Sequence, residues 1–334
     1  MAIEVATAAD LDNVRNNLGG SYIQTANIDL SGYNWVPIGT YPDGNPDAPF
    51  TGSYNGQGYI INNLTINRDE RYQGLFQYVT GNISNVLLRD VSISMSGILS
   101  YANPLVVYLY GSVTGCSATG AVSAYSWASG LVGIVQEYAT LATSYSKCNI
   151  TCRQNAGGLV AGTVGAINNC YSRSNLLGWS DGRLLWSGGF VSDIYAGATI
   201  TNAYCAGSML NDAADNGGFS NQLNYAGNTV NSYWDASVSG YGDSGMGEGR
   251  TTAEMTHPEN FTTTYIDWDF VDIWKHDPSY TINDGYPHFG VAFNIWVKKG
   301  GEWIQVTEIW VKKGGVWQAV TDVSTLKGGN WNTV

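Results

Sequence analysis

The feature that most constrains this chain is an internal repeat of roughly 26 to 33 residues, running from Gly74 to about Gly240. Each unit opens with a small residue, usually followed by two apolar ones. The six openings are Gly74-Leu75-Phe76, Pro104-Leu105-Val106, Gly130-Leu131-Val132, Gly158-Leu159-Val160, Gly189-Phe190-Val191 and Gly218-Phe219-Ser220. One unit of this length cannot bury its own apolar face, whereas stacked copies can. The period therefore predicts a solenoid.

A second signature follows each opening after about ten residues. Its copies begin at Ile83, Val113, Leu141, Ile167, Ile200 and Val230. Asn or Gly at the corners is expected to supply the left-handed backbone angles that sharp turns need. Three residues after each start the side chain is expected to face inward, and the next one to face outward. The outward positions predict a tyrosine ladder on one face: Tyr145, Tyr171 and Tyr204.

These patterns predict an all-β fold, a right-handed parallel β-helix. The composition agrees, because 42 Gly and 22 Tyr accompany only 13% charged residues, a mixture that favours short strands and tight turns. A β-sandwich would show hairpin turns every 8 to 12 residues and no longer sequence repeat. The repeat favours the solenoid.

The repeat also resembles a known group. The Gly-Leu/Phe-Val opening with an Ile-x-Asn-Cys-Tyr signature is similar to the GLUG-type repeats of bacterial surface proteins and phage proteins. The stretch from Phe50 to Ile66 resembles the first rung that usually precedes them, and Gly249 to Pro287 resembles their closing segment. The resemblance implies a β-helix and leaves adhesion, structural and other roles open.

The sequence predicts four parts: an N-terminal cap (1–20), β-helix repeats (21–245), a closing segment (246–290) and a C-terminal tandem hairpin module (291–334). In the cap, Thr7 is predicted to begin a short helix, with Asp10 completing a variant of the capping box. Leu11, Val14 and Leu18 would form its apolar stripe.

The tail contains three copies of a Trp-Lys-Gly pattern around Gly-Gly turns, which predicts β-hairpins. It resembles C-terminal segments of phage virion proteins, and this implies other virion proteins as partners. Its strands would also gain partners in a homo-oligomer such as a trimer. The lysines would either protect strand edges or dock onto an acidic surface. The assembly residues predicted here are Trp296, Trp303, Trp310, Trp317, Trp331, Lys298, Lys299, Lys312 and Lys313.

No catalytic residue, cofactor or metal site is predicted. The three histidines, His257, His276 and His288, have no HExxH spacing, and no phosphate loop or GxSxG elbow occurs. The five cysteines are expected to be buried free thiols. A glycosidase would need two carboxylates facing one groove. Asp212 with Asp215, or Asp181 near them, is the pair that would be tested.

A glycan-binding face is the stronger hypothesis. Aromatic residues gather where the third strand of each unit ends, and one loop adds polar groups; the candidates are Tyr101, Tyr125, Trp127, Trp179, Asp181, Arg183 and Trp186. If Trp127 and Trp179 share a corner two rungs apart, their separation of about 10 Å suits alternate sugar rings. The alternative is that these rings pack against a neighbouring subunit.

The net charge of −12 argues against nucleic-acid binding, and no apolar stretch predicts a membrane span or a secretory signal. The resemblance of the tail to phage virion segments implies a virion protein. With no catalytic residue predicted, we expect a non-enzymatic one, foremost a tail fibre or receptor-binding adhesin that recognises a host surface glycan. The alternatives are a head decoration protein and a tailspike depolymerase.

Overall fold

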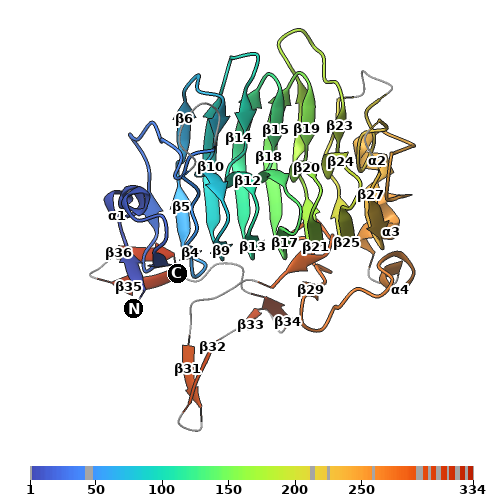
Figure 1. Cartoon of the computed structure of the whole chain (residues 1–334). Helices are drawn as coiled ribbons and strands as arrows, with labels where there is room; N and C mark the ends of the chain where they lie inside the picture. Colours follow the sequence, from blue (N-terminus) through green and yellow to red (C-terminus); the bar gives the residue numbers. More distant parts are fainter. Residues whose placement is uncertain are drawn as a thin grey trace.

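The computed structural model of the protein describes residues 2–41, 48–210, 215–223, 226–257 and 260–290. It also describes the backbone of six strands between residues 296 and 333. The chain forms a parallel β-solenoid of about 7 turns, whose stacked rungs run side by side in Figure 1. The predicted fold class is confirmed.

Three sheets form the walls of the coil. The main sheet contains 18 strands: β1 (Ile3–Val5), β2 (Ser21–Gln24), β3 (Ile28–Asp29), β4 (Ser53–Asn55), β5 (Ile60–Asn62), β6 (Thr65–Asn67), β9 (Asn82–Ser84), β10 (Leu87–Ser94), β13 (Ser112–Thr114), β14 (Ser117–Ala124), β17 (Thr140–Ala142), β18 (Tyr145–Cys152), β21 (Ala166–Ser172), β22 (Asn175–Gly178), β25 (Thr199–Cys205), β26 (Asn228–Val230), β27 (Tyr233–Asp235) and β28 (Glu248–Arg250).

Two five-stranded sheets complete the coil. The narrow sheet contains β7 (Tyr72–Gln73), β11 (Tyr101–Ala102), β15 (Trp127–Ser129), β19 (Asn155–Gly157) and β23 (Ser187–Gly188). The flank sheet contains β8 (Phe76–Val79), β12 (Val106–Leu109), β16 (Val132–Val135), β20 (Val160–Thr163) and β24 (Val191–Ile194). All pairings in both sheets are parallel between successive rungs.

The register of the strands follows the sequence repeat. The third residues of five openings are aligned in the flank sheet: Phe76, Val106, Val132, Val160 and Val191. The starts of five second signatures are aligned in the main sheet: Ile83, Val113, Leu141, Ile167 and Ile200. All these side chains are buried in one continuous core. Stacking therefore buries the apolar face that a single unit would leave exposed.

The corners after these positions have left-handed backbone angles, as predicted. The φ values are 53° at Asn85, 66° at Gly115, 44° at Thr143, 51° at Asn169, 53° at Asn202 and 47° at Asn231. Asn and Gly adopt this region readily, but a β-branched threonine does not. Thr143 is therefore the strained member of the column.

Both ends of the coil are covered. At the N-terminal end, α1 (Ala8–Asn13) and the 3-10 helix η1 (Val14–Asn16) bury Leu11 and Val14. Thr7 is the N-cap and forms the predicted capping box with Asp10. At the other end, seen in Figure 1, lie α2 (Ala236–Ser239), α3 (Thr252–Thr256) and α4 (Phe261–Thr264). The antiparallel pair β29 (Trp274–Lys275) and β30 (His288–Phe289) lies against the outer face of the main sheet.

The tyrosine ladder is present, but the closing segment covers it. Tyr145 stacks on Tyr171 with ring centroids 4.7 Å apart, and Tyr171 stacks on Tyr204 at 5.1 Å. Trp274 and Phe289 pack over Tyr171. Tyr204 is fully buried. The rings point away from the coil as alternation requires, but they form the floor of a second hydrophobic core instead of an exposed face.

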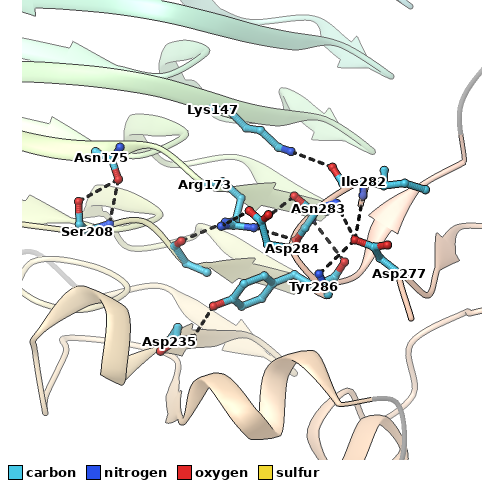
Figure 2. Close-up of polar contacts among 12 residues, drawn as sticks. Lys147, Arg173, Asn175, Ser208, Asp235, Asp277, Ile282, Asn283, Asp284 and Tyr286 are labelled. Carbon is cyan, nitrogen blue, oxygen red and sulfur yellow. Dashed lines mark hydrogen bonds and ion pairs between the residues drawn. The ribbon is translucent and has the colours of Figure 1, made fainter. Parts of the chain in front are cut away.

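Polar contacts hold the closing segment to the coil (Figure 2). Arg173 donates from Nη1 to the Asn283 carbonyl at 2.8 Å and forms an ion pair with Asp284 at 3.0 Å. Its guanidinium also lies 4.4 Å from the centre of the Tyr286 ring. The Tyr286 hydroxyl donates to the buried carboxylate of Asp235 at 2.6 Å. The segment is thus attached by both apolar and charged contacts.

The tail contains three antiparallel hairpins. They pair β31 (Trp296–Lys299) with β32 (Glu302–Gln305), β33 (Trp310–Lys313) with β34 (Val316–Ala319), and β35 (Ser324–Lys327) with β36 (Asn330–Thr333). The predicted hairpins are confirmed. The side chains of the predicted assembly residues, five Trp and four Lys, lie outside the described part of the structure.

Candidate binding surface

An aromatic column follows the narrow sheet. Tyr72, Tyr101 and Trp127 are in register on three successive rungs. The rings of Tyr101 and Trp127 are parallel within 3°, with centroids 5.7 Å apart, and Tyr72 lies 5.0 Å from Tyr101. The Arg71 guanidinium lies 5.0 Å from the Tyr72 ring and 5.4 Å from the Tyr101 ring. The sequence predicted Tyr101 and Trp127 for the site but not Tyr72 or Arg71.

Tyr78 and Tyr108 of the flank sheet, together with Tyr41, pack around this column. Tyr108 lies 5.3 Å from Tyr72 and stacks on Tyr41 at 4.0 Å. Tyr78 contacts Tyr41 as well. Tyr108 is nearly buried, and burial together with Tyr72 and Tyr101 raises the pKa of its hydroxyl far above the ordinary value. These rings support the column rather than offering free faces. Sequence reasoning missed them because Tyr78 and Tyr108 come from another sheet and Tyr41 precedes the repeat that begins at Gly74.

The column ends at Trp127. The next residue in register is Asn155, which carries no ring. On the flank sheet the neighbouring position is Gly162, where an added methyl group would lie 3.6 Å from the Trp127 ring and 3.5 Å from the Tyr195 ring. Trp127 is half-buried and Tyr195 is 36% exposed. The two rings thus flank a position without a side chain.

A buried carboxylate lies beside these rings. Asp193 is fully buried and accepts hydrogen bonds from Asn155 Nδ2 at 3.0 Å and Asn221 Nδ2 at 2.5 Å. Burial raises the pKa of the Tyr195 hydroxyl, and the charge of Asp193 and a hydrogen bond with its carboxylate add to that shift. A satisfied network of this kind fixes the orientation of the exposed groups above it.

The remaining predicted residues form a separate group. Trp179 meets Tyr125 edge-on at 5.8 Å. Asp181 forms a 2.7 Å ion pair with Arg153, whose guanidinium lies 5.9 Å from the Tyr125 ring. Asp181 also accepts from the backbone N–H of Arg183 at 3.1 Å. Asp181 and Arg183 therefore belong to a structured exposed loop.

The structure does not place Trp127 and Trp179 in the same column of aligned residues. Gly178, just before Trp179, aligns with Cys152, which in turn aligns with Ala124, just before Tyr125. Trp179 thus occupies the column of Tyr125. The residue two rungs from Trp127 in its own column is Trp186, because Ser187 pairs with Ala156. Trp186 has a left-handed φ of 50°.

Among the described residues, few side chains could serve catalysis or metal binding. Asp212 lies outside the described residues, and Asp181 is held by Arg153. Within the described ranges, no group of three or more His, Cys, Asp and Glu side chains could hold a metal ion. The five cysteines are buried and free, as predicted, and burial raises the pKa of four of them, Cys116, Cys148, Cys152 and Cys170, to about 12.

The closing segment contains a pocket that the sequence did not suggest. Its volume is about 740 Å³, and its lining is mainly aromatic, including Phe261, Tyr265, Trp268, Phe270 and His276. Stacking on Phe270 and Phe261 orders His276. Burial lowers the pKa of His276, and the nearby His288 lowers it further. The rings of this pocket pack the segment against itself and, through Tyr265 and Trp268, against Tyr204 and Tyr233 of the coil.

The fold and this surface define a parallel β-helix protein with a partly exposed aromatic flank. Solved structures share the architecture. A Bacteroides ovatus protein, provisionally named an immunoglobulin A1 protease, matches 86% of this chain and 92% of its own chain with a TM-score of 0.65 and 18% identity. A second structure, named IgA1 protease, matches 74% of this chain and 21% of its own with a TM-score of 0.55. At this identity the likeness shows the fold alone.

Curated relatives match shorter stretches. A protein of Evansella cellulosilytica, provisionally named a Gly-rich membrane protein, is 38% identical over 120 residues. Halomucin of Haloquadratum walsbyi is 32% identical over 174 residues. The matches span 13% and 2% of those proteins, and 33% and 48% of this chain. No family model matches the chain. In the described part of the chain, no helix is both long and apolar enough to cross a membrane.

Proposed function

We propose that this protein is an adhesin-like β-helix that binds a surface glycan through its aromatic flank. The observation that carries this proposal is the ring column of the narrow sheet, which ends in the half-buried Trp127. Indole and phenol rings bind the C–H faces of sugars and provide a polar edge for hydroxyl groups. The column lies on rigid strands, so little order has to be gained on binding.

Polar groups for sugar hydroxyls lie close to the ring. Tyr195, which is 36% exposed, lies across Gly162 from it, and the buried network of Asn155 and Asp193 lies beside both rings and orders them. Arg71 over Tyr72 and Tyr101 adds a donor at the other end of the column. The second group, Tyr125 with Trp179, Asp181 and Arg183, is proposed as an accessory contact for a longer glycan.

We further propose that the tail attaches the molecule to a larger particle. Three successive hairpins support this role, because isolated hairpins need partners to be stable. The resemblance of the tail to phage virion segments suggests a phage particle, in which other virion proteins and a homo-oligomer such as a trimer would provide these partners. Imaging particles labelled at the C-terminus of this chain tests the placement at a tail fibre or on the head.

The binding proposal is tested with the full chain on a glycan array, followed by titration of the glycans that bind. Trp127→Ala is expected to weaken binding at least tenfold, because it removes the stacking face. Tyr33→Ala is the matched control, since Tyr33 is 41% exposed and lies before the ring column in the chain. Equal affinity of wild type and Trp127→Ala would overturn the assignment of the flank.

The same preparations test catalysis. Release of reducing ends from a bound polysaccharide would identify a depolymerase, and cleavage of immunoglobulin A1 would identify a protease like those named among the structural neighbours. Either result would replace the non-enzymatic proposal.

A further inference from the structure

Unequal turns create a notch at one corner of the coil. Four residues, 136–139, connect β16 to β17, and four residues, 195–198, connect β24 to β25. The rung between them has only two connecting residues, 164–165, from β20 to β21. The strands that follow these turns are aligned through Thr140, Ala166 and Thr199. The short turn therefore lies between two long ones.

The notch has a volume of about 400 Å³. Its walls lie two rungs apart, about 10 Å by strand spacing. Its lining combines small residues, including Ala139, Gly165, Ala166, Ala196 and Gly197, with polar ones, Glu137, Tyr138, Thr140 and Thr199. Tyr195 belongs to one of the long turns and also contacts Gly162 opposite Trp127. The turn that forms one wall of the notch thus also carries a ring of the aromatic flank.

Tyr138 is unusual for its position. It is 89% exposed and has a left-handed φ of 65°. The turn is closed by a hydrogen bond from Ala139 N–H to the Gln136 carbonyl at 3.0 Å. The other long turn is closed in the same way, from Ala198 to Tyr195 at 3.1 Å, and has Gly197 at the equivalent position with a φ of 94°. The fold therefore accepts glycine here.

A bulky exposed ring in a strained position points to a use outside folding. Glu137 reinforces this view, because a hydrogen bond with Glu137 and the charge of its carboxylate raise the pKa of the Tyr138 hydroxyl. An aromatic face, a carboxylate and two threonine hydroxyls at the rim of a small notch are groups that recognise a pyranose ring. The carboxylate and the net charge of −12 oppose acidic sugars.

We infer that the notch between turns 136–139 and 195–198 is a subsite for one neutral hexose, which stacks on Tyr138 and donates hydroxyl hydrogen bonds to Glu137. This inference rests on the proposed glycan binding. It adds where the binding site ends and which class of sugar occupies that end. A glycan lying along the flank from Trp127 would place its terminal ring here.

Saturation-transfer NMR with the full chain tests the subsite. The probes are methyl glycosides of glucose, galactose, mannose and N-acetylglucosamine, with glucuronic acid and sialic acid glycosides as acidic counterparts. Tyr138→Gly is expected to lower the affinity for the best neutral glycoside at least tenfold without lowering the melting temperature. Glu137→Gln is expected to weaken the same glycoside severalfold.

The matched control is Tyr280→Gly. Tyr280 is also exposed, at 46%, with a φ of 57°, but it lies in the closing segment. This variant should bind as wild type does. Unchanged binding by Tyr138→Gly, or equal binding of neutral and acidic glycosides, would overturn the inference. If Trp127→Ala alone loses binding, the subsite is wrong and the flank stands. If wild type binds no glycan, both proposals are wrong.

Discussion

At the residue scale, the six corner residues with left-handed φ show how one backbone angle affects stability. Five of its six members are Asn or Gly, and Thr143 adopts the same left-handed region at 44°. The penalty for a β-branched residue there is about 1–2 kcal/mol. The column tolerates it because strands β17 and β18 on either side are paired on both edges.

Thr143→Asn is therefore expected to stabilise the protein by about 1 kcal/mol. Urea unfolding at neutral pH measures the change. Asn202→Thr, at the equivalent corner two rungs away, should lower the stability by a similar amount. A loss of stability in Thr143→Asn would show that the threonine side chain makes a contact worth more than the strain.

Asp277 is a second residue whose contribution can be measured. Four backbone N–H groups donate to its carboxylate, those of Thr281, Ile282, Asn283 and Gly285. Burial on its own would raise the pKa of Asp277, but these hydrogen bonds outweigh it and hold the pKa below 3.8. Since the folded pKa is depressed, the stabilisation is fully present above pH 3.8 and is lost as the pH falls through the folded value.

Hydrogen exchange of the amides at 281–285 should accordingly accelerate below pH 3.8, relative to the intrinsic exchange rate. Asp277→Asn should exchange faster at neutral pH and lose this acid dependence, with a cost of about 1–3 kcal/mol to the local structure. The same acid dependence in Asp277→Asn would assign the effect to another group.

At the scale of elements, the sequence predicted the features that are set within one rung or between adjacent rungs. The strand openings, the corner angles, the N-cap at Thr7 and the hairpin pattern of the tail all follow from spacing, because each rung contacts mainly the next one. The outward direction of Tyr145, Tyr171 and Tyr204 also followed from alternation. Their burial did not, because it depends on Trp274 and Phe289, which lie far away in sequence.

The site was predicted in part for the same reason. Tyr101 and Trp127 were identified, but the alignment of Trp127 with Trp186 instead of Trp179 was not, because the long loop around Trp179 obscures the register. The unequal turns at 136–139 and 164–165 were present in the sequence as unequal spacings between the opening and the second signature, 11 residues from Gly130 to Leu141 but 9 from Gly158 to Ile167. The notch between them became visible only when the following strands were aligned.

At the scale of the whole molecule, two cores lie on opposite sides of the main sheet. The coil core runs through all rungs, and the closing-segment core lies on the outer side of the main sheet. Trp274 is fully buried in the second core, 4.3 Å from Trp268, and its Nε1 donates to Asn169 at 3.2 Å. The closing segment is expected to open before the coil does.

Calorimetry should therefore resolve two transitions. Trp274→Ala is expected to reduce the free energy of unfolding of the first transition by about 3–5 kcal/mol and to leave the second nearly unchanged, because Trp274 packs among the rings of the closing-segment core and contributes no side chain to the coil core. Leu159→Ala, in the coil core, should move the second transition instead. A single transition shifted equally by both variants would show that the two cores unfold as one unit.

The covered ladder also has a consequence for synthesis on the ribosome. Tyr204 is made well before Phe289, and at about 5–20 residues per second the interval is on the order of 4–17 s. During this time the rungs can stack while three tyrosine rings await their cover. A nascent chain of this kind presents a flat aromatic strip to the cytosol, so holding chaperones that recognise such strips would act on this protein at one defined stage of translation.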